Sequence, residues 1–213
     1  MKNKEKTTHK RGRPVNEAHR EHIIATAGEL FMTHGLQATT MEMVARAAGM
    51  SKLTLYSRFE SKDALFAAVI RAKCSEYIPD HFFGDFHRKP VEQSLFDITY
   101  GLMQLLTSDD VKAMEAMLMA EAKRRGSLVQ QFYEAGPLRV KKLIAEHLEK
   151  LHEQGVLHIP DAVLATNLLT ATVKGSDICM RHCMNIPPAP TQKDMQHYCR
   201  QAVAMFMRAH QKP

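Results

Sequence analysis

Residues 40–62 read TMEMVARAAGMSKLTLYSRFESK. From Met41 onward the apolar residues recur at spacings of three and four, which predicts a short amphipathic helix. Gly49 interrupts this period, and Ser51 offers a hydroxyl N-cap at which a second helix can begin. The stretch therefore predicts a helix, a tight turn and a second helix over about residues 41–60, which is a helix-turn-helix motif.

The second helix of this motif is poor in core residues and rich in groups that bind polyanions. Short hydroxyls and cations can reach phosphate oxygens, and a single helix fits the major groove of B-DNA. The residues predicted to contact phosphates are Thr40, Ser51, Thr54 and Lys62. The candidates for reading base sequence are Lys52, Leu53, Tyr56 and Arg58, with Ser57 beside them. For Arg58, pairing with guanine and neutralising a phosphate are both open.

The residues before the motif are predicted to form one more helix and a basic N-terminal arm. Residues 17–34 have the apolar period of a helix that Gly35 should end, and residues 1–16 are a polar, basic arm. Of the net charge of +6, most lies in the first 62 residues, which hold 11 Lys and Arg against 6 Asp and Glu. Arg11 and Arg13 could enter an A·T-rich minor groove, or the arm could be a solvated tail.

The motif and its flanks resemble the DNA-binding domain of the TetR family of bacterial transcriptional regulators. The matching features are Leu30-Phe31, Gly35, Ala38-Thr39-Thr40, Val44-Ala45, Ala48-Gly49-Met50-Ser51-Lys52, Thr54-Leu55-Tyr56, Phe59 and Ser61-Lys62-Asp63-Ala64-Leu65. The resemblance implies a three-helix DNA-binding domain over residues 17–64 and a ligand-binding and dimerisation domain over residues 65–213. It also implies a homodimer that binds double-stranded DNA at a palindromic operator. The chain departs from the family pattern at Glu42, Leu53 and Ser57-Arg58.

The rest of the chain is also expected to be helical, so the predicted fold class is all-α. Helices are expected over Val91–Thr107, Asp110–Arg125, Ser127–Gln154, about 161–184 and Thr191–Ala209. Gly136-Pro137 should kink or interrupt the third of these, because proline removes a backbone donor and clashes with the preceding turn.

The C-terminal part more loosely resembles the AefR-like branch of the same family, through residues 120–122, 132–137 and 155–157. That resemblance implies a ligand-sensing bundle, and the apolar stripes of the last two helices suit a four-helix dimer interface. Methionine is flexible and lines adaptable pockets, although it also serves as core filler. The candidate pocket residues are Met103, Met117, Phe132 and Met180.

Other chemistries have little support in the sequence. Cys179 and Cys183 share one helical face near His182, which permits a metal or thiol-sensing reading, but small-residue packing explains the spacing as well. We predict no metal, no cofactor and no enzymatic activity, because no catalytic motif is present. The chain has no apolar run of membrane-spanning length and no secretory signal, so we expect it in the bacterial cytoplasm, on the nucleoid when bound to DNA.

These observations predict a sequence-specific transcriptional regulator, a repressor relieved by an unknown small apolar effector. Two alternatives stay open: a regulator controlled by a protein partner or by thiol oxidation, and an architectural DNA-binding protein of weak sequence preference.

Overall fold

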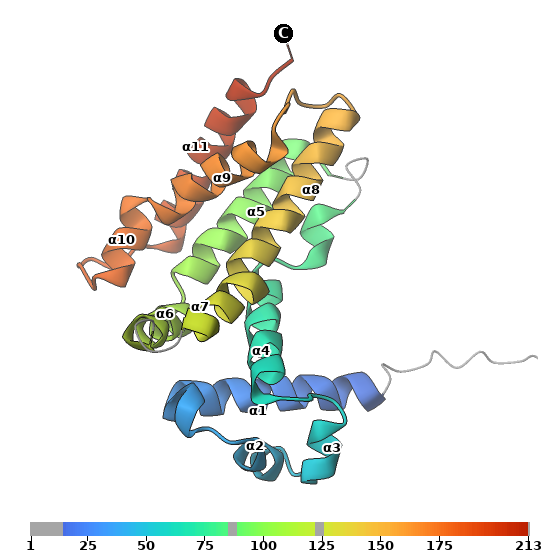
Figure 1. Ribbon diagram of the computed structural model, residues 1–213. Coiled ribbons are helices and arrows are strands. Elements are labelled where there is room, and N and C mark those ends of the chain that lie inside the picture. The colour runs from blue at the N-terminus through green and yellow to red at the C-terminus, as the bar shows by residue number, and fades with distance from the viewer. Residues whose placement is uncertain (1–14, 85–88, 122–125, 213) are drawn as a thin grey trace, which may run out of the picture. The chain divides into compact units, whose positions relative to one another are not determined.

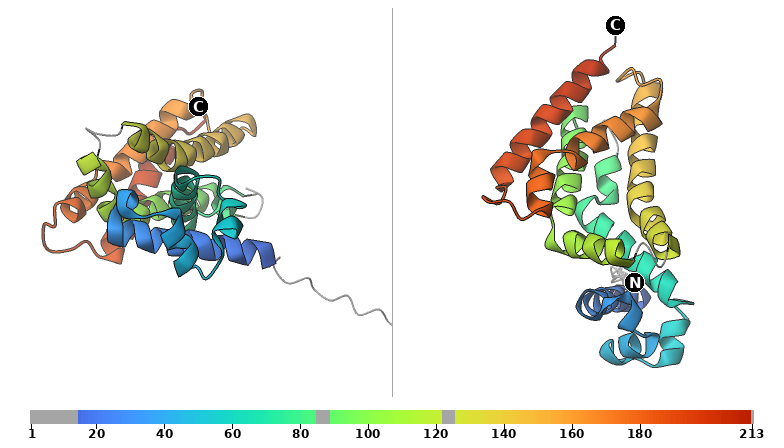
Figure 2. Two further views of the ribbon diagram at one scale, coloured as in Figure 1. Left: turned by 60° about the horizontal axis from the view of Figure 1, so that its bottom comes forward. Right: turned by 60° about the vertical axis from the view of Figure 1, so that its left-hand side comes forward.

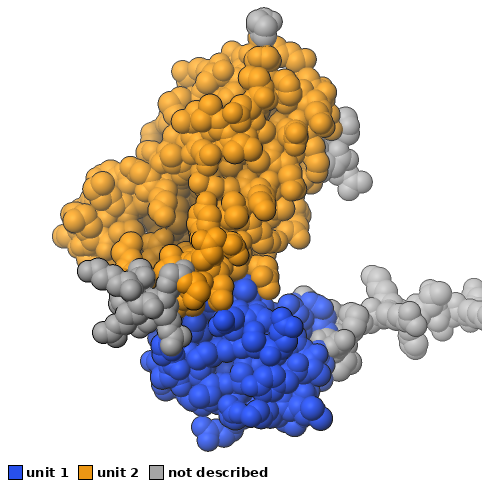
Figure 3. Space-filling view, in the orientation of Figure 1, with its two compact units in different colours: residues 1–69 blue, residues 70–213 orange. Residues whose placement is uncertain are grey.

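Helices make up most of the described residues of the protein. The computed structural model describes residues 15–84, 89–121 and 126–212, and no strand occurs within these ranges (Figure 1). The predicted all-α class is confirmed. The chain divides into two compact units, residues 1–69 and residues 70–213, which are coloured separately in Figure 3.

The first unit is a small helical domain with its own core. Its helices are α1 (Val15–Ala38), α2 (Met41–Ala47), α3 (Lys52–Tyr56) and the first half of α4 (Lys62–Tyr77). The Phe31 and Phe66 rings meet edge to face with their centroids 5.8 Å apart, and Leu55 and Leu65 are fully buried beside this core. An apolar core of this kind holds α3, which is too short to be stable alone, against the rest of the unit.

Side-chain caps fix where the two motif helices begin. Thr40 precedes α2, and its hydroxyl accepts a hydrogen bond from the Met43 backbone N–H (3.2 Å). Ser51 precedes α3 in the same way and accepts from the Thr54 N–H (3.0 Å). Both N-caps satisfy backbone donors that the helix cannot pair itself. The expected starts of α2 and α3 are therefore confirmed.

The turn between α2 and α3 depends on one backbone conformation. Gly49 has a φ of 66°, in the left-handed region that glycine adopts at little cost. The Gly49 N–H donates to Arg46 O (3.2 Å) and the Met50 N–H donates to Ala45 O (3.0 Å), which closes the end of α2 as a Schellman motif. This turn sets the direction in which α3 leaves α2.

The end of α1 differs slightly from the prediction. Gly35 has a non-helical conformation (φ 78°, ψ 159°), but the chain makes a further turn up to Ala38. The Thr39 side chain is fully buried, and its hydroxyl donates to Gly35 O (2.8 Å) and Leu30 O (3.1 Å). Thr39 thus secures the end of α1, and Thr40 alone caps α2.

The second unit is a bundle built around α5. After the second half of α4 its elements are η1 (Asp80–Phe83), α5 (Val91–Leu106), α6 (Asp109–Glu121), α7 (Gly126–Tyr133), the π-helical turn η2 (Glu134–Leu138), α8 (Arg139–Glu153), α9 (Ala162–Lys174), α10 (Asp177–Cys183) and α11 (Gln192–Ala209). Helix α5 packs against α9 and α11, and α8 packs against α9 (Figure 2). The Tyr198 hydroxyl of α11 donates to Thr172 O of α9 (2.7 Å), which ties these two helices together.

The structure bears on two expectations about long helices. The expected interruption at Gly136-Pro137 is confirmed, since α7 ends at Tyr133, α8 begins at Arg139, and the π-helical turn η2 joins them. The single helix expected over about 161–184 is wrong. Helix α9 ends at its C-cap Gly175, and the Ser176 hydroxyl accepts from the Cys179 N–H (3.2 Å) to start α10. A glycine followed by a capping serine favours such a break over a continuous helix.

Candidate nucleic-acid interface

Helix α3 presents nearly all of its side chains to solvent. Leu55 is its one buried residue, whereas the Leu53 side chain is 82% exposed and Tyr56 is 40% exposed. Ser51, Lys52, Thr54 and Ser57 are exposed as well. Leu53 is the most exposed large apolar residue among the described residues.

The hydroxyl groups on this surface are held by local hydrogen bonds. Ser51 Oγ and Thr54 Oγ1 lie 2.8 Å apart, and Ser57 Oγ donates to Thr54 O (2.8 Å). Thr40 is also exposed, and its hydroxyl caps the start of α2 as that of Ser51 caps the start of α3. The structure therefore places short hydroxyl side chains at the exposed starts of both motif helices.

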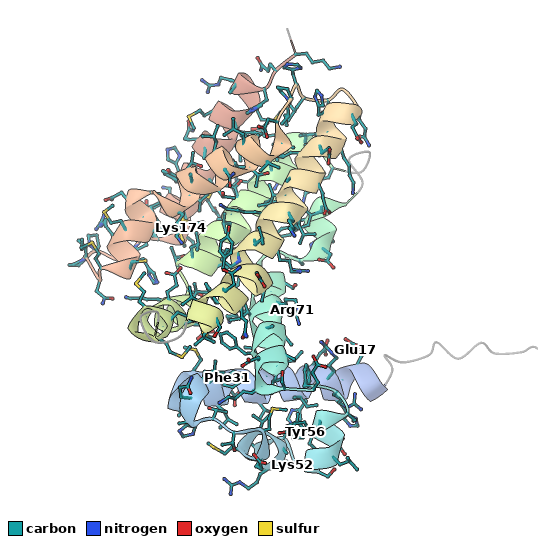
Figure 4. All side chains as sticks on the ribbon, in the orientation of Figure 1. Glu17, Phe31, Lys52, Tyr56, Arg71 and Lys174 are labelled. Atoms are coloured by element: carbon teal, nitrogen blue, oxygen red, sulfur yellow. The ribbon has the colours of Figure 1, made fainter. Side chains whose placement is uncertain are left out.

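Lys52 makes two contacts on this surface that the sequence pattern did not predict. Its ammonium forms an ion pair with the Glu42 carboxylate of α2. The same nitrogen lies 5.7 Å from the centroid of the Tyr56 ring, and both Lys52 and Tyr56 are labelled in Figure 4. The Lys52 ammonium is the main cause that lowers the pKa of the Glu42 carboxyl, and the carboxylate in turn raises the pKa of Lys52. Glu42 and Lys52 lie ten positions apart on different helices, so no helical spacing could have revealed their contact.

Lys62 is directed into its own domain. Its Nζ donates to Leu36 O (2.7 Å), Thr39 O (3.0 Å) and Gln37 O (3.3 Å). These carbonyls belong to the C-terminal end of α1 and the link to α2, where a cation is favoured by unpaired carbonyls and the helix dipole. An ammonium has three N–H donors, and each of them has a protein acceptor here.

The remaining predicted DNA contacts differ in accessibility. Arg58 is half-buried, unlike its exposed neighbours on α3. Arg11 and Arg13 lie outside the described residues. The accessible set thus centres on α3 and on the starts of α2 and α3.

The candidate ligand residues in the second unit do not share one environment. Met103 is fully buried, and the Cys179 thiol donates to its sulfur (3.6 Å). Met117 and Phe132 are half-buried, whereas Met180 is exposed on α10. Met103, Met117 and Phe132 have the burial of ligand-lining or core residues, and Met180 has that of a surface residue.

Three of the four cysteines are poorly suited to redox sensing. Cys74, Cys179 and Cys199 are buried, and burial raises the pKa of all three thiols, to about 11 for Cys74 and about 12 for Cys199. A redox-sensing thiol needs the opposite shift, since the thiolate is the reactive form. Within the described ranges no cluster of three or more His, Cys, Asp or Glu residues could hold a metal, and no helix is long and apolar enough to cross a membrane.

Comparison with known protein families agrees with this geometry. The family model described as bacterial regulatory proteins, tetR family, matches residues 23–69. A second model, described as AefR-like transcriptional repressor, C-terminal domain, matches residues 93–212. The two matched segments together include α2, α3 and all helices from α6 to α11.

Among curated proteins, the chain is 33% identical to the HTH-type transcriptional repressor ComR of Escherichia coli K12 over 104 residues, which is 48% of this chain and 49% of ComR. It is 42% identical to the E. coli K12 regulator RutR over 66 residues, 31% of each chain. The matches thus span half or less of the length of these relatives.

Solved structures match over nearly the whole chain. A TetR-family regulator from Mesorhizobium loti MAFF303099 has a TM-score of 0.73 at 22% identity and covers 94% of this chain and 100% of its own. The flavonoid-responsive regulator FrrA has a TM-score of 0.70 at 27% identity and covers 92% of this chain and 98% of its own. At 22% identity, the likeness to the Mesorhizobium loti regulator concerns the fold alone.

Proposed function

Because the chain belongs to the TetR family of bacterial transcriptional regulators and carries an AefR-like C-terminal domain, we propose that it is a homodimeric repressor of a palindromic operator. A small apolar effector bound in the second unit would relieve the repression. The single observation that carries the DNA-binding part is α3, where one residue is buried and the others form an exposed surface of hydroxyl, cationic and apolar side chains.

We assign different tasks to the residues of this surface. Thr40, Ser51 and Thr54 contact phosphates and fix the register of α3 on the duplex. Lys52, Leu53 and Tyr56 read bases, since lysine pairs with guanine acceptors and an exposed apolar side chain can pack on a thymine methyl. Ser57 and the half-buried Arg58 flank them, and Arg11 and Arg13 remain candidates for a minor-groove contact.

Lys62 receives a different role from the one the sequence suggested. Its three carbonyl contacts support a positioning function, in which it holds the end of α1 and thereby the Thr40 cap of α2. Phosphate binding would require Lys62 to leave these carbonyls.

Two features support the homodimer. Leu164 and Leu168 lie one turn apart on α9 and are both more than half exposed, as is Met205 on α11. Helices α9 and α11 contact each other within the bundle, so their outer sides can pair with the same helices of a second copy about a two-fold axis. Two reading helices related by that axis require a palindromic operator.

The proposed effector class rests on the second unit and on one relative. Met103, Met117 and Phe132 contribute flexible or aromatic apolar side chains, which suit a small apolar ligand. FrrA, which is similar over 92% of this chain, is a flavonoid-responsive regulator. A planar aromatic molecule is therefore the first class to test. To relieve repression, it must bind the DNA-free state more tightly than the DNA-bound state.

The test begins with selection of preferred duplexes by the full-length protein from a random pool, followed by footprinting of the selected site. Tyr56→Ala should abolish protection of that site while helix content and dimer mass stay at wild-type values. Tyr133→Ala removes a ring of similar exposure (42%, against 40% for Tyr56) from the second unit and should leave the footprint intact. Failure of the wild-type protein to enrich any sequence, or a normal footprint from Tyr56→Ala, would refute the assignment.

A further inference from the structure

The proposed DNA-reading surface comprises α3 and the starts of α2 and α3. It contains an acidic residue, Glu42, which forms an ion pair with Lys52 of the same surface. Glu42 lies in the first turn of α2 and Lys52 is the first residue of α3, so their ion pair joins the two helices of the motif. Both side chains are more than half exposed, on a surface expected to face a polyanion. A carboxylate in that place repels phosphates, so its presence needs a functional reason.

The pair also fixes the direction of the Lys52 side chain. A free lysine is a mobile point charge on a four-carbon stem and can neutralise any phosphate within reach. In this structure the Lys52 ammonium pairs with the Glu42 carboxylate and lies 5.7 Å from the centroid of the Tyr56 ring. Lys52 is thereby kept beside Tyr56, one of the proposed base-reading residues, on the exposed side of α3.

Sequence-independent affinity for DNA comes mainly from lysine and arginine contacts to phosphates, whereas discrimination comes from contacts to base edges. A lysine that is kept away from phosphates and held beside the base edges therefore lowers nonspecific binding more than it lowers operator binding. We propose that Glu42 is a specificity-determining residue, which holds Lys52 beside Tyr56 and withholds it from the phosphates. This inference rests on the proposed DNA-binding function of α3.

Stability measurements alone would not reveal this role, because exposed ion pairs contribute little to folding. The informative quantity is the dependence of DNA affinity on salt. Each phosphate contact contributes about 0.9 to the slope of log K against log salt concentration. One additional contact corresponds to a roughly fivefold increase in affinity at about 0.15 M salt.

The experiment measures binding of full-length protein to two labelled duplexes, the selected operator and an unrelated sequence, over a range of salt concentrations. With Glu42→Gln, the slope on the unrelated duplex should steepen by about 0.9, and the operator preference should fall about fivefold. Glu29→Gln removes an exposed carboxylate from α1 of the same unit and should leave both values at wild type.

A second background tests whether Glu42 acts through Lys52. In Lys52→Met protein, adding Glu42→Gln should leave the salt slope unchanged. A change of slope that persists there would mean that Glu42 repels phosphates directly, and it would overturn the proposal. So would a wild-type slope in the Glu42→Gln single variant. A wild-type protein without any operator preference would instead contradict the proposed function itself.

Discussion

At the scale of one residue, Lys62 was predicted to contact a DNA phosphate, whereas its side chain binds backbone carbonyls of its own chain. A lysine at the start of a helix beside a DNA-binding motif suggests a phosphate contact. In the structure the same ammonium donates to Leu36 O, Gln37 O and Thr39 O, 23 to 26 residues earlier in the chain. These carbonyls lie at the end of α1, directly before the Thr40 cap.

Replacing Lys62 by methionine should therefore act on folding before it acts on DNA. The free energy of unfolding should fall by about 1–3 kcal/mol, as expected when hydrogen bonds to a charged group are lost. Urea unfolding measures this change. The salt slope of operator binding should keep its wild-type value, whereas loss of a phosphate contact would reduce it by about one. Arg46→Met, at an exposed cation on α2, is the comparison variant for stability.

His147 is a second residue whose environment only the structure reveals. Its side chain is 1% exposed on α8, and its Nε2 shares a hydrogen bond of 3.1 Å with Ser94 Oγ on α5. The Ser94 hydroxyl also donates to Phe82 O (3.0 Å). Burial lowers the pKa of His147 to about 4, so the imidazole is neutral in the folded protein at neutral pH.

This shift predicts a loss of stability in mild acid. Below a pKa of about 6.5 the unfolded chain binds a proton at His147 that the folded chain does not bind until about pH 4. The free energy of unfolding should therefore fall by about 2 kcal/mol from this residue between pH 7.5 and 5. Urea unfolding at both pH values should show a smaller decrease for His147→Gln. Ser94→Ala retains the imidazole and should keep most of the pH dependence of the unfolding free energy. An equal decrease in wild type and in His147→Gln would contradict this account.

At the scale of elements, the α2–α3 turn depends on the backbone of Gly49. A Cβ added there would meet no atom within 4 Å, so a substitution at Gly49 tests the positive φ and not packing. Gly49→Val should cost about 1–2 kcal/mol, because an L-residue resists the left-handed conformation. It should also weaken operator binding by changing the direction of α3. Gly49→Asn should be tolerated better, since asparagine adopts this conformation readily. Thermal unfolding and operator titration of the two variants would check this order, and equal losses would exclude a backbone cause.

The elements themselves could largely be predicted from local signals. The caps at Thr40 and Ser51 and the turn at Gly49 involve residues within a few positions of one another, and the structure confirms them. The same kind of local signal stands at Gly175-Ser176, where the structure separates α9 from α10 although a single helix was predicted. The interruption at Gly136-Pro137 was predicted from the proline, but its π-helical form was not. A Cβ on Gly136 would approach Ile70 Cγ2 to 2.9 Å, so α4 packs closely against this turn, and that contact is not local.

At the scale of the whole molecule, the proposed function requires two copies. Leu168 on α9 is 57% exposed, and Leu164 and Met205 accompany it. Leu164→Asp with Leu168→Asp should convert the dimer to a monomer, because two-fold symmetry brings the added charges together in an apolar interface. Sedimentation velocity would show the change in mass, and operator affinity should fall because each monomer reads one half-site.

The matched control is Met119→Asp. Met119 is a highly exposed apolar residue on α6 of the same unit, and its replacement should leave both the dimer and the operator affinity intact. Dimers that survive the double substitution on α9 would place the interface on another surface.

The sequence by itself determined the helical class and the helix-turn-helix motif, because caps, glycine turns and apolar periods act over a few residues. The family followed from the resemblance of the motif residues to the TetR pattern. The tertiary structure alone decided which groups on the motif are exposed and which are engaged with other residues of the chain. It engages Lys62 with carbonyls of α1, joins Lys52 to Glu42, and leaves Leu53 exposed. The physical reason is that these partners lie 10 to 26 positions apart and meet only when the helices pack, so no periodicity along the chain encodes their contact.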